Sequence, residues 1–254
     1  MTTVAPTLAQ SLANPTRFMA LSAAALQWLS AVAALTLAVG LYLTFWVSPP
    51  DYQQGQTVKI MYVHVPSAWL GMAAYLTVAA SSFGLLVFRH PLADVSARAA
   101  APIGAAFTLL ALVTGSLWGK PMWGTYWVWD ARLTSVLLLF FLYLGLIALR
   151  SAVEDESAAA KLTAVLALVG VALLPVIKFS VEWWATLHQP STQFTSTLDA
   201  SFRTPLLVNA VGFTLLFACM HIKAMRNEVL RRRVKALQIA VVRQAGTANV
   251  VTSP

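Results

Sequence analysis

Charged residues divide this chain into six long uncharged stretches. These stretches are rich in apolar side chains and cover residues 18–50, 60–88, 99–119, 133–149, 162–177 and 204–222. An α-helix needs about 20 residues, within a range of roughly 17 to 25, to cross the apolar part of a bilayer. The pattern therefore predicts six transmembrane helices, at approximately 20–47, 63–88, 99–117, 132–149, 162–181 and 204–225.

Two of the six helices need a further argument. The fifth uncharged stretch has only 16 residues, so its helix must continue through Lys178 and Phe179 to cross a bilayer. The first stretch is far longer than the apolar core of a signal peptide, which has about 7 to 15 residues. We therefore expect the first helix to be retained rather than cleaved.

The composition agrees with a membrane protein. Of the 254 residues, 59% are hydrophobic and 10% are charged, whereas ordinary soluble domains carry roughly 25% charged residues. So few polar side chains cannot cover a water-exposed globule of this size, and disordered chains are poor in apolar residues. The expected fold is an all-α integral membrane protein, with residues 1–254 forming a single six-helix domain.

The positions of the basic residues predict the orientation. Six spans place both termini on one side, and twelve of the 17 Lys and Arg residues then share that side, against five on the other. Basic residues favour the cytoplasmic side of a membrane protein. We expect both termini in the cytoplasm of a bacterial cell, in its inner membrane, with the segments near 48–65, 118–132 and 179–204 in the periplasm. This distribution explains the net charge of +8 without nucleic acid.

The basic C-terminal tail, residues 226–254, belongs to the cytoplasmic side in this arrangement. Within it, residues 226–243 have the pattern of an amphipathic helix, whose apolar side would consist of Val229, Leu230, Val234, Leu237 and Val241. Such a helix favours attachment along the membrane surface. Binding of a partner is the alternative.

The periplasmic loop at residues 118–132 is unusually rich in tryptophan. Trp118, Trp123, Trp127 and Trp129 fall within twelve residues. Tryptophan is common at membrane interfaces, where it anchors the ends of helices, and this is the simplest interpretation. So many rings close together, with Gly and Pro between them, also suit a large planar ligand with an apolar centre.

Two polar residues end this loop. Asp130 precedes an apolar stretch, and we expect its carboxylate to cap the helix that follows, in preference to any catalytic role. Arg132 has two interpretations, an ion pair with Asp130 or a contact with a carboxylate of a ligand. The sequence does not choose between them.

Two of the four histidines are expected on the same periplasmic side as the tryptophans. His64 lies at the start of the second helix, where Pro66 suits a first helical turn, and His188 follows the fifth helix. Neutral imidazoles from separate segments can bind one metal from opposite sides. Two histidines do not complete a zinc site, so iron in a porphyrin is the better candidate. His90 and His221 are expected on the cytoplasmic side, in structural roles.

Other sequence features limit the chemistry. The chain has no Gly-x-x-x-x-Gly-Lys-Ser/Thr phosphate loop, so ATP hydrolysis would have to come from a partner. Cys219 is the single cysteine, and no Cys-x-x-Cys-His sequence for covalent haem attachment is present. We therefore expect a non-covalently bound haem and no enzymatic activity.

The tryptophan-rich segment resembles the WWD signature of a haem-handling protein family, and within it cytochrome c maturation protein C (CcmC). The resemblance covers most of residues 50–205, and the similar segments are Asp51–Gly55, Tyr62–Pro66, Ala101–Ala105, Trp118–Thr134 and Ser180–Gln189. Tyr126 stands where many relatives have a further tryptophan, a change that keeps an aromatic ring.

This resemblance implies a six-helix inner-membrane protein that binds haem b at its periplasmic face. His64 and His188 match the family's axial iron ligands, and the matching haem-binding loop contains Trp118, Trp123, Trp127, Trp129 and Asp130. The family transfers haem to the periplasmic chaperone CcmE during the biogenesis of c-type cytochromes. It works with the small membrane protein CcmD and belongs to an ABC transporter complex with the CcmA ATPase and the CcmB permease. Candidates for contact with the haem propionates are Lys59, Lys120, Arg132 and Arg203.

Two other functions remain as alternatives. The first is a b-type electron carrier, which would more naturally hold its haem within the helix bundle. The second is a permease for haem or another solute. The central parts of the predicted helices have no Asp, Glu, Lys or Arg, which gives an ion or proton path through this chain little support.

Overall fold

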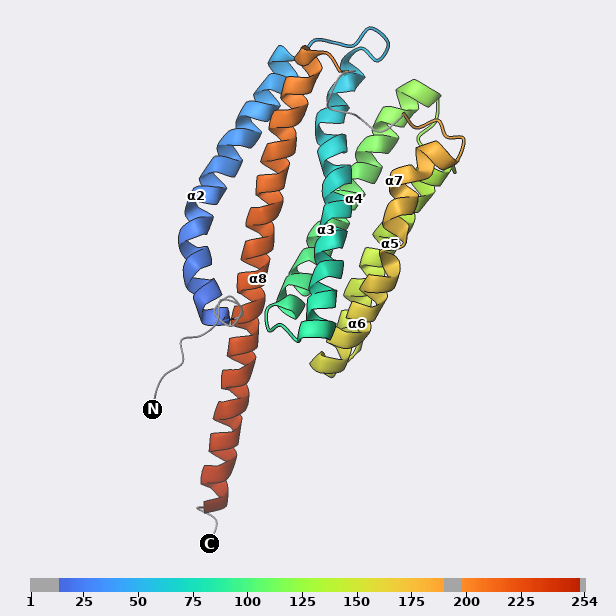
Figure 1. Ribbon diagram of the computed structural model, residues 1–254. Coiled ribbons are helices and arrows are strands. Elements are labelled where there is room, and N and C mark those ends of the chain that lie inside the picture. Colours follow the sequence, from blue (N-terminus) through green and yellow to red (C-terminus); the bar gives the residue numbers. More distant parts are fainter. Residues whose placement is uncertain (1–13, 190–197, 252–254) are drawn as a thin grey trace.

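The protein is built from helices that run up and down the molecule (Figure 1). The computed structural model describes residues 14–189 and 198–251, with side chains as far as residue 244. The α-helices are α2 (Pro15–Tyr42), α3 (Met61–Phe88), α4 (Ala93–Trp123), α5 (Ala131–Ala152), α6 (Glu156–Gly170), α7 (Leu173–Trp183) and α8 (Ala200–Val251). A π-helical turn, η1 (Leu43–Val47), continues α2, and a 3-10 helix, η2 (Gln56–Ile60), leads into α3.

The prediction of six helices able to cross a membrane is confirmed. Within the described residues, six helical segments are long and apolar enough, and they cover Pro15–Val47, Gln56–Phe88, Ala93–Trp123, Ala131–Ala152, Glu156–Trp183 and Ala200–Gln244. They are longer than the predicted spans because their ends continue past the first charged residues. An example is α3, which begins at Met61, so that Pro66 lies one turn further inside the helix than expected.

The fifth crossing segment consists of two helices, α6 and α7. Gly170 ends α6, and Pro175 is the third residue of α7. Because Pro175 has no N–H to donate to a carbonyl one turn earlier, it interrupts the hydrogen bonds of a continuous helix. The chain passes the break with short-range backbone bonds, such as that from the Ala172 N–H to the Val169 carbonyl at 3.3 Å.

A pair of antiparallel helices, α3 and α4, forms the centre of the bundle. Helices α2 and α8 pack together on one side of this pair, and α5, α6 and α7 lie on the other (Figure 1). The same end of the bundle, the upper end in Figure 1, therefore holds all three of the loops 48–55, 124–130 and 184–189. The turn between α3 and α4 lies at the lower end.

Two buried tyrosines join the helices of the core. The Tyr75 hydroxyl of α3 donates to the Ala167 carbonyl of α6 at 3.0 Å, and the Tyr143 hydroxyl of α5 donates to the Gly71 carbonyl of α3 at 2.7 Å. Both side chains are fully buried, so each hydroxyl needs a partner inside the protein. Gly170 lies close to Tyr75, because a Cβ there would be 2.1 Å from the Tyr75 hydroxyl oxygen.

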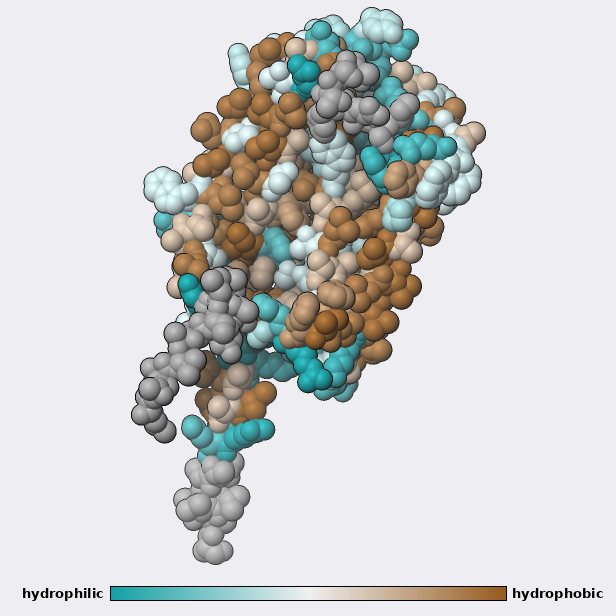
Figure 2. Space-filling view, viewed as in Figure 1, coloured by the Kyte–Doolittle hydropathy of each residue, from teal (hydrophilic) through white to brown (hydrophobic). Residues whose placement is uncertain are grey.

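The outer surface of the bundle is apolar over its middle. Figure 2 shows hydrophobic residues across most of this height, with hydrophilic residues gathered towards both ends. Large apolar side chains such as Trp28, Leu35 and Phe88 are exposed on this surface, at 77%, 67% and 71%. A surface of this kind is stable in contact with lipid and not with water.

The C-terminal segment differs from its prediction. Residues 226–251 do not form a separate helix along the surface, because α8 continues without a break from Ala200 to Val251 and extends beyond the lower end of the bundle (Figure 1). The first part of this extension is held by the bundle, since Val229 packs in an apolar cluster with Leu92 and Val95. Residues 252–254 lie outside the described residues.

Candidate functional site

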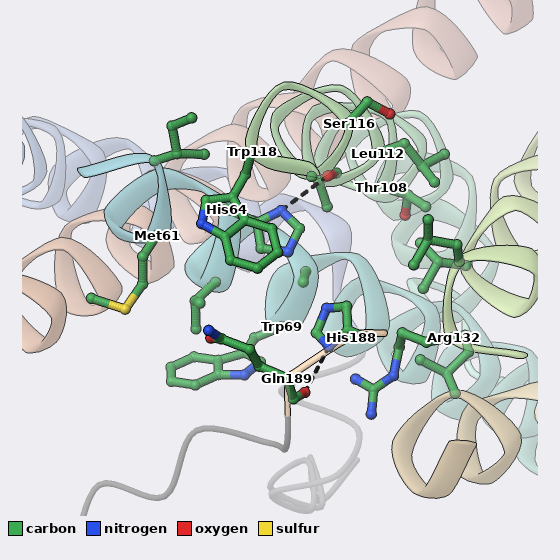
Figure 3. Close-up of a pocket in the computed structure, with 18 of the residues that line it drawn as sticks. Met61, His64, Trp69, Thr108, Leu112, Ser116, Trp118, Arg132, His188 and Gln189 are labelled. Carbon is green, nitrogen blue, oxygen red and sulfur yellow. Dashed lines mark hydrogen bonds between the residues drawn. The ribbon is translucent and has the colours of Figure 1, made fainter. Parts of the chain in front are cut away.

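A cavity of about 220 Å³ lies among the residues at the upper end of the bundle. Figure 3 shows its lining side chains in close-up. Its wall comes from α3, α4, α5 and α7 and from the segments that carry Gln54, Trp127 and His188. The deeper wall is apolar and includes Met72, Leu139 and Ile177, whereas both predicted histidines lie on its upper part. The fold thus brings together residues that are more than a hundred positions apart in the sequence.

His64 lies against α4. Its Nδ1 is 3.0 Å from the Ala111 carbonyl oxygen and 3.1 Å from the Thr114 hydroxyl oxygen. Because a carbonyl only accepts hydrogen bonds, Nδ1 is the protonated nitrogen, and Nε2 has the free lone pair. Gly115 leaves room for the ring, since a Cβ there would lie 3.0 Å from the His64 Cε1 atom.

His188 lies in the loop after α7 and is held in a similar way. Its Nδ1 donates to the Gln189 carbonyl at 2.7 Å, which again leaves Nε2 with the free lone pair. Burial lowers the pKa of the His188 imidazole below its ordinary value, and the hydrogen bond to Gln189 opposes this change. The net shift favours the neutral ring, the form that binds metals.

The two imidazoles face each other across the cavity (Figure 3). Their ring centroids are 6.4 Å apart, and their planes are inclined by 38°. Imidazole binds zinc at about 2.0–2.1 Å, and the ring centroid lies roughly 1 Å behind the nitrogen, so two rings on opposite sides of one metal have centroids about 6 Å apart. The separation of His64 and His188 therefore suits one metal atom between them.

Part of the predicted tryptophan loop is helical. Helix α4 continues to Trp123, so the connection to α5 is residues 124–130 and not 118–132. Gly124 ends α4 in the left-handed conformation, with φ 77°, which glycine adopts readily. Trp118 and Trp123 consequently project from the last turns of a helix, with their rings edge to face at 5.2 Å.

Three of the four predicted tryptophans line the cavity: Trp118, Trp123 and Trp127. Trp118 is fixed by a hydrogen bond from its Nε1 to Gln54 at 2.9 Å. The Nε1 of Trp127 is buried and has no hydrogen-bond partner among the described residues. Buried donors normally have a partner, so an unpaired N–H on a residue of the cavity wall is unusual.

Trp129 is placed differently from the prediction. It is 78% exposed and does not belong to the cavity wall. Its ring packs edge to face on Trp127, with centroids 5.6 Å apart. Trp129 therefore contacts a residue of the cavity wall, Trp127, without lining the cavity itself.

Asp130 caps α5, as expected, and also does not line the cavity. Its carboxylate accepts from the Leu133 N–H at 2.8 Å, and the Thr186 hydroxyl donates to its second oxygen. The same Thr186 oxygen accepts from the backbone N–H of His188 at 3.0 Å. Asp130 is thus connected through Thr186 to the segment that carries His188.

Arg132 is on the cavity wall, close to His188 (Figure 3). Its Nε donates to the Ser180 hydroxyl at 2.7 Å, and a terminal nitrogen donates to the Lys178 carbonyl at 3.3 Å. Of the four basic residues proposed for ligand carboxylates, Arg132 is the one that lines this cavity, and Lys178 lines it as well. Lys59 and Lys120 instead donate to the Phe45 and Gly124 carbonyls.

Several residues of the site were not identified from the sequence. Trp69, Met61 and Gln189 line the cavity, and Thr186 supports it. The positions 61, 65, 68 and 72 on α3 recur at the helical period, and this recurrence around His64 could have indicated the wall. No comparable pattern marks Thr186, because its role depends on two loops that are distant in sequence.

The ligand set is incomplete for a bare metal ion. Over residues 14–189 and 198–244, no group of three or more His, Cys, Asp or Glu side chains is arranged to hold one. A porphyrin supplies four nitrogen ligands of its own, so its iron needs only the two imidazoles. The residues present therefore fit haem better than an isolated metal ion.

The chain is similar to a family model and to several known proteins, and all of these comparisons point to the same family. A model of the CcmC family, described as "Heme exporter protein C", matches residues 8–240. The chain is 63% identical to heme exporter protein C of Bradyrhizobium diazoefficiens over 231 residues, which are 90% of this chain and 88% of the relative. It is 47% identical to heme exporter protein C of Escherichia coli strain K12, covering 86% of this chain and 89% of the relative. A putative cytochrome c biosynthesis ccmC-like mitochondrial protein of Marchantia polymorpha is 46% identical, over 76% of this chain and 83% of the relative.

Proposed function

This chain belongs to the heme exporter protein C family, and on that basis we propose that it binds haem b between His64 and His188 and passes it on unchanged. The chain is a multi-pass membrane protein of a haem-handling family. The haem is its cargo, held without a covalent bond. The protein's role is to position the haem for an acceptor and not to catalyse a reaction.

The arrangement of the two histidines carries this proposal. Their ring centroids are 6.4 Å apart, and each Nδ1 is engaged by a backbone carbonyl. Such hydrogen bonds fix the orientation of a ligating ring and leave Nε2 for the metal. We therefore assign the Nε2 atoms of His64 in α3 and of His188 in the loop after α7 as the two ligands of one iron atom.

The rest of the cavity suits the other parts of haem. The indole rings of Trp118, Trp123 and Trp127 offer apolar faces to a flat macrocycle. The free N–H of Trp127 and the guanidinium of Arg132 provide donors for carboxylates such as propionates. A ligand with an apolar centre and acidic side groups matches this distribution.

The location supports transfer to a protein outside the membrane. Helix α8 extends beyond the lower end of the bundle (Figure 1), and the positive-inside rule assigns this basic end to the cytoplasm. The residues that line the cavity lie at the opposite end. We therefore place the site at the periplasmic face of a bacterial inner membrane, with both termini cytoplasmic. There it can deliver haem to the chaperone CcmE, together with CcmD and with the ATPase and permease subunits CcmA and CcmB.

The test of the ligands is the visible spectrum of the purified, haem-loaded protein. We expect a six-coordinate low-spin spectrum that is lost in both His64→Ala and His188→Ala. His90→Ala is the matched control, because His90 lies at the other end of the bundle, where its Nδ1 accepts from the Leu92 N–H. If each single variant at His64 and His188 keeps the wild-type spectrum, the ligand assignment is wrong.

The test of transfer is incubation of the haem-loaded protein with purified apo-CcmE. We expect haem to move to the chaperone and the low-spin spectrum of the donor to decrease accordingly. A b-type electron carrier would instead retain its haem through cycles of reduction and oxidation. Complete retention would therefore contradict the transfer proposal while leaving the histidine ligands in place.

A further inference from the structure

A second cavity lies at the opposite end of the bundle from His64 and His188. It has a volume of about 170 Å³ and is lined by α3, α4, α5 and α6. One water needs roughly 10–15 Å³ by this measure, so the cavity is large enough for a bulkier group. Apolar side chains such as Val78, Leu85 and Leu146 form much of its wall, and Arg98 and Arg150 supply positive charge.

Arg150 lines this cavity and has one unused donor. Its side chain is only 8% exposed, and its two terminal nitrogens donate to both oxygens of Asp94 at 2.6 and 2.7 Å. The remaining Nε is buried and lacks a hydrogen-bond partner within the described part of the chain. A buried N–H without an acceptor costs free energy, so the site is incomplete without a further acceptor.

The charges around the cavity are also unbalanced. Within the described residues, an ion-pair network beside it joins five basic residues, Arg98, Arg150, Arg231, Arg232 and Lys235, to three acidic residues, Asp94, Glu156 and Glu228. Of these, Arg98, Arg150 and Asp94 line the cavity itself. Arg98 has the weakest of these contacts, because its Nε is 3.5 Å from a Glu228 carboxylate that Arg231 and Arg232 already occupy. The wall of the cavity thus has two arginines and one aspartate, and this positive charge favours an anion beside Arg98 and Arg150.

We propose that this cavity binds the phosphate of an anionic phospholipid, with Arg98 and the Nε of Arg150 as its donors. Guanidinium groups match the geometry of phosphate oxygens, and basic pockets between membrane helices bind lipid headgroups in this way. The cavity lies near the end of the crossing segments, where headgroups are found, and its apolar wall suits acyl chains. Free inorganic phosphate offers the same oxygens, so the experiment must separate the two sources.

The test is a titration of the full-length purified protein in detergent, followed by native mass spectrometry. The probes are dioctanoyl-phosphatidylglycerol, dioctanoyl-phosphatidylcholine and inorganic phosphate. Two variants change the cavity: Arg98→Gln removes a donor, and Thr163→Leu fills space at a wall residue without changing charge. Lys161→Gln is the control, because it removes one charge from an exposed position on the same part of α6.

We expect one phosphatidylglycerol per protein at saturation and much weaker binding of the zwitterionic lipid. Arg98→Gln and Thr163→Leu should each weaken phosphatidylglycerol binding by about tenfold or more, as the loss of a charge-assisted hydrogen bond or of its space predicts. Lys161→Gln should bind as the wild type does. Melting curves of all variants identify any that fail to fold, and two different cavity variants keep the test valid if one of them does.

Competition with inorganic phosphate identifies the source of the anion. If millimolar phosphate does not displace the lipid, the lipid headgroup is the ligand, and if it does, the site accepts phosphate from either source. Equal binding of the two lipids, or wild-type affinity in both cavity variants, would overturn the proposal. So would the absence of any saturable binding of phosphatidylglycerol and phosphate.

Discussion

Small and polar residues behind the two histidines decide where the rings can lie. Gly115 lets His64 approach α4 closely enough for its Nδ1 to reach the Ala111 carbonyl. Thr186 connects the backbone of His188 to Asp130. None of these residues needs to touch the ligand in order to affect its binding, because outer-shell partners orient the residues that do.

Gly115→Val should displace His64. The first added carbon would already lie 3.0 Å from the His64 Cε1 atom, and the branches of valine increase the overlap. We expect the dissociation constant for haem to rise about tenfold and the low-spin spectrum to weaken. Gly145→Val is the control, because a Cβ at Gly145 meets no atom within 4 Å. An unchanged spectrum in Gly115→Val would contradict the assigned position of His64.

Thr186→Val should loosen His188 while keeping the volume of the side chain. The variant removes the hydroxyl that donates to Asp130 and accepts from the His188 N–H. We expect faster loss of haem, by about tenfold, measured as transfer to an excess of apo-myoglobin. Thr186→Ser restores the hydroxyl and should recover the wild-type rate. Equal rates in all three proteins would show that this connection has no effect on the site.

At the scale of the helices, close contacts between glycines and large side chains set the spacing. Gly104 of α4 lies against Tyr143 of α5, whose hydroxyl crosses to the Gly71 carbonyl of α3. Because Gly104 has no side chain, the ring of Tyr143 fits between α4, α5 and α3 and contacts all three helices. In membranes, small residues at helix contacts have this general function.

Gly104→Ala should therefore destabilise the bundle. The new Cβ would lie 2.1 Å from the Tyr143 hydroxyl oxygen, and Tyr143 is fully buried and cannot move into free space. Overpacking of this kind costs about 1–3 kcal/mol, and we expect the thermal midpoint in detergent to fall by about 2–4 °C for each kcal/mol. Gly145→Ala should leave the midpoint unchanged or raise it slightly. A Gly104→Ala protein as stable as the wild type would mean that the helices separate easily.

At the scale of the whole molecule, the two ends of the bundle differ in the kind of side chains that they bring together. The upper end holds the two histidines, and the lower end holds a network of ion pairs. In this network the Asp94 carboxylate of α4 accepts hydrogen bonds from Arg150 of α5 and Arg232 of α8. The lower network thus connects three helices that lie on different sides of the bundle.

Asp94→Asn should lower the stability of the protein through the lower end of the bundle without changing the haem site at the upper end. It leaves Arg150, whose side chain is 8% exposed, without its charged partner, and breaking a buried ion pair costs about 3–5 kcal/mol. We expect a lower melting temperature but an unchanged haem spectrum in the folded protein, because His64 and His188 lie at the other end. A changed spectrum at full folding would show that the two ends are coupled. An unchanged melting temperature would show that the network contributes little stability.

The sequence by itself determined the number of spans and the end of the bundle at which each loop lies. These features follow from local quantities: the length of each apolar stretch relative to the bilayer, and the alternation of sides that consecutive crossings impose. The capping role of Asp130 was equally local, because it depends on the residues immediately after it. His64 and His188 could be assigned to one end for the same reason, before any distance between them was known.

The tertiary structure decided how the helices turn and pack, and with that which side chains meet. The 6.4 Å separation of the imidazoles, the exclusion of Trp129 from the cavity and the connection from Asp130 through Thr186 depend on packing between segments distant in the chain. The same is true of the lower cavity, where α3, α4, α5 and α6 meet. Hydrophobic length places a helix across the membrane, but only interlocking side chains fix its rotation and neighbours.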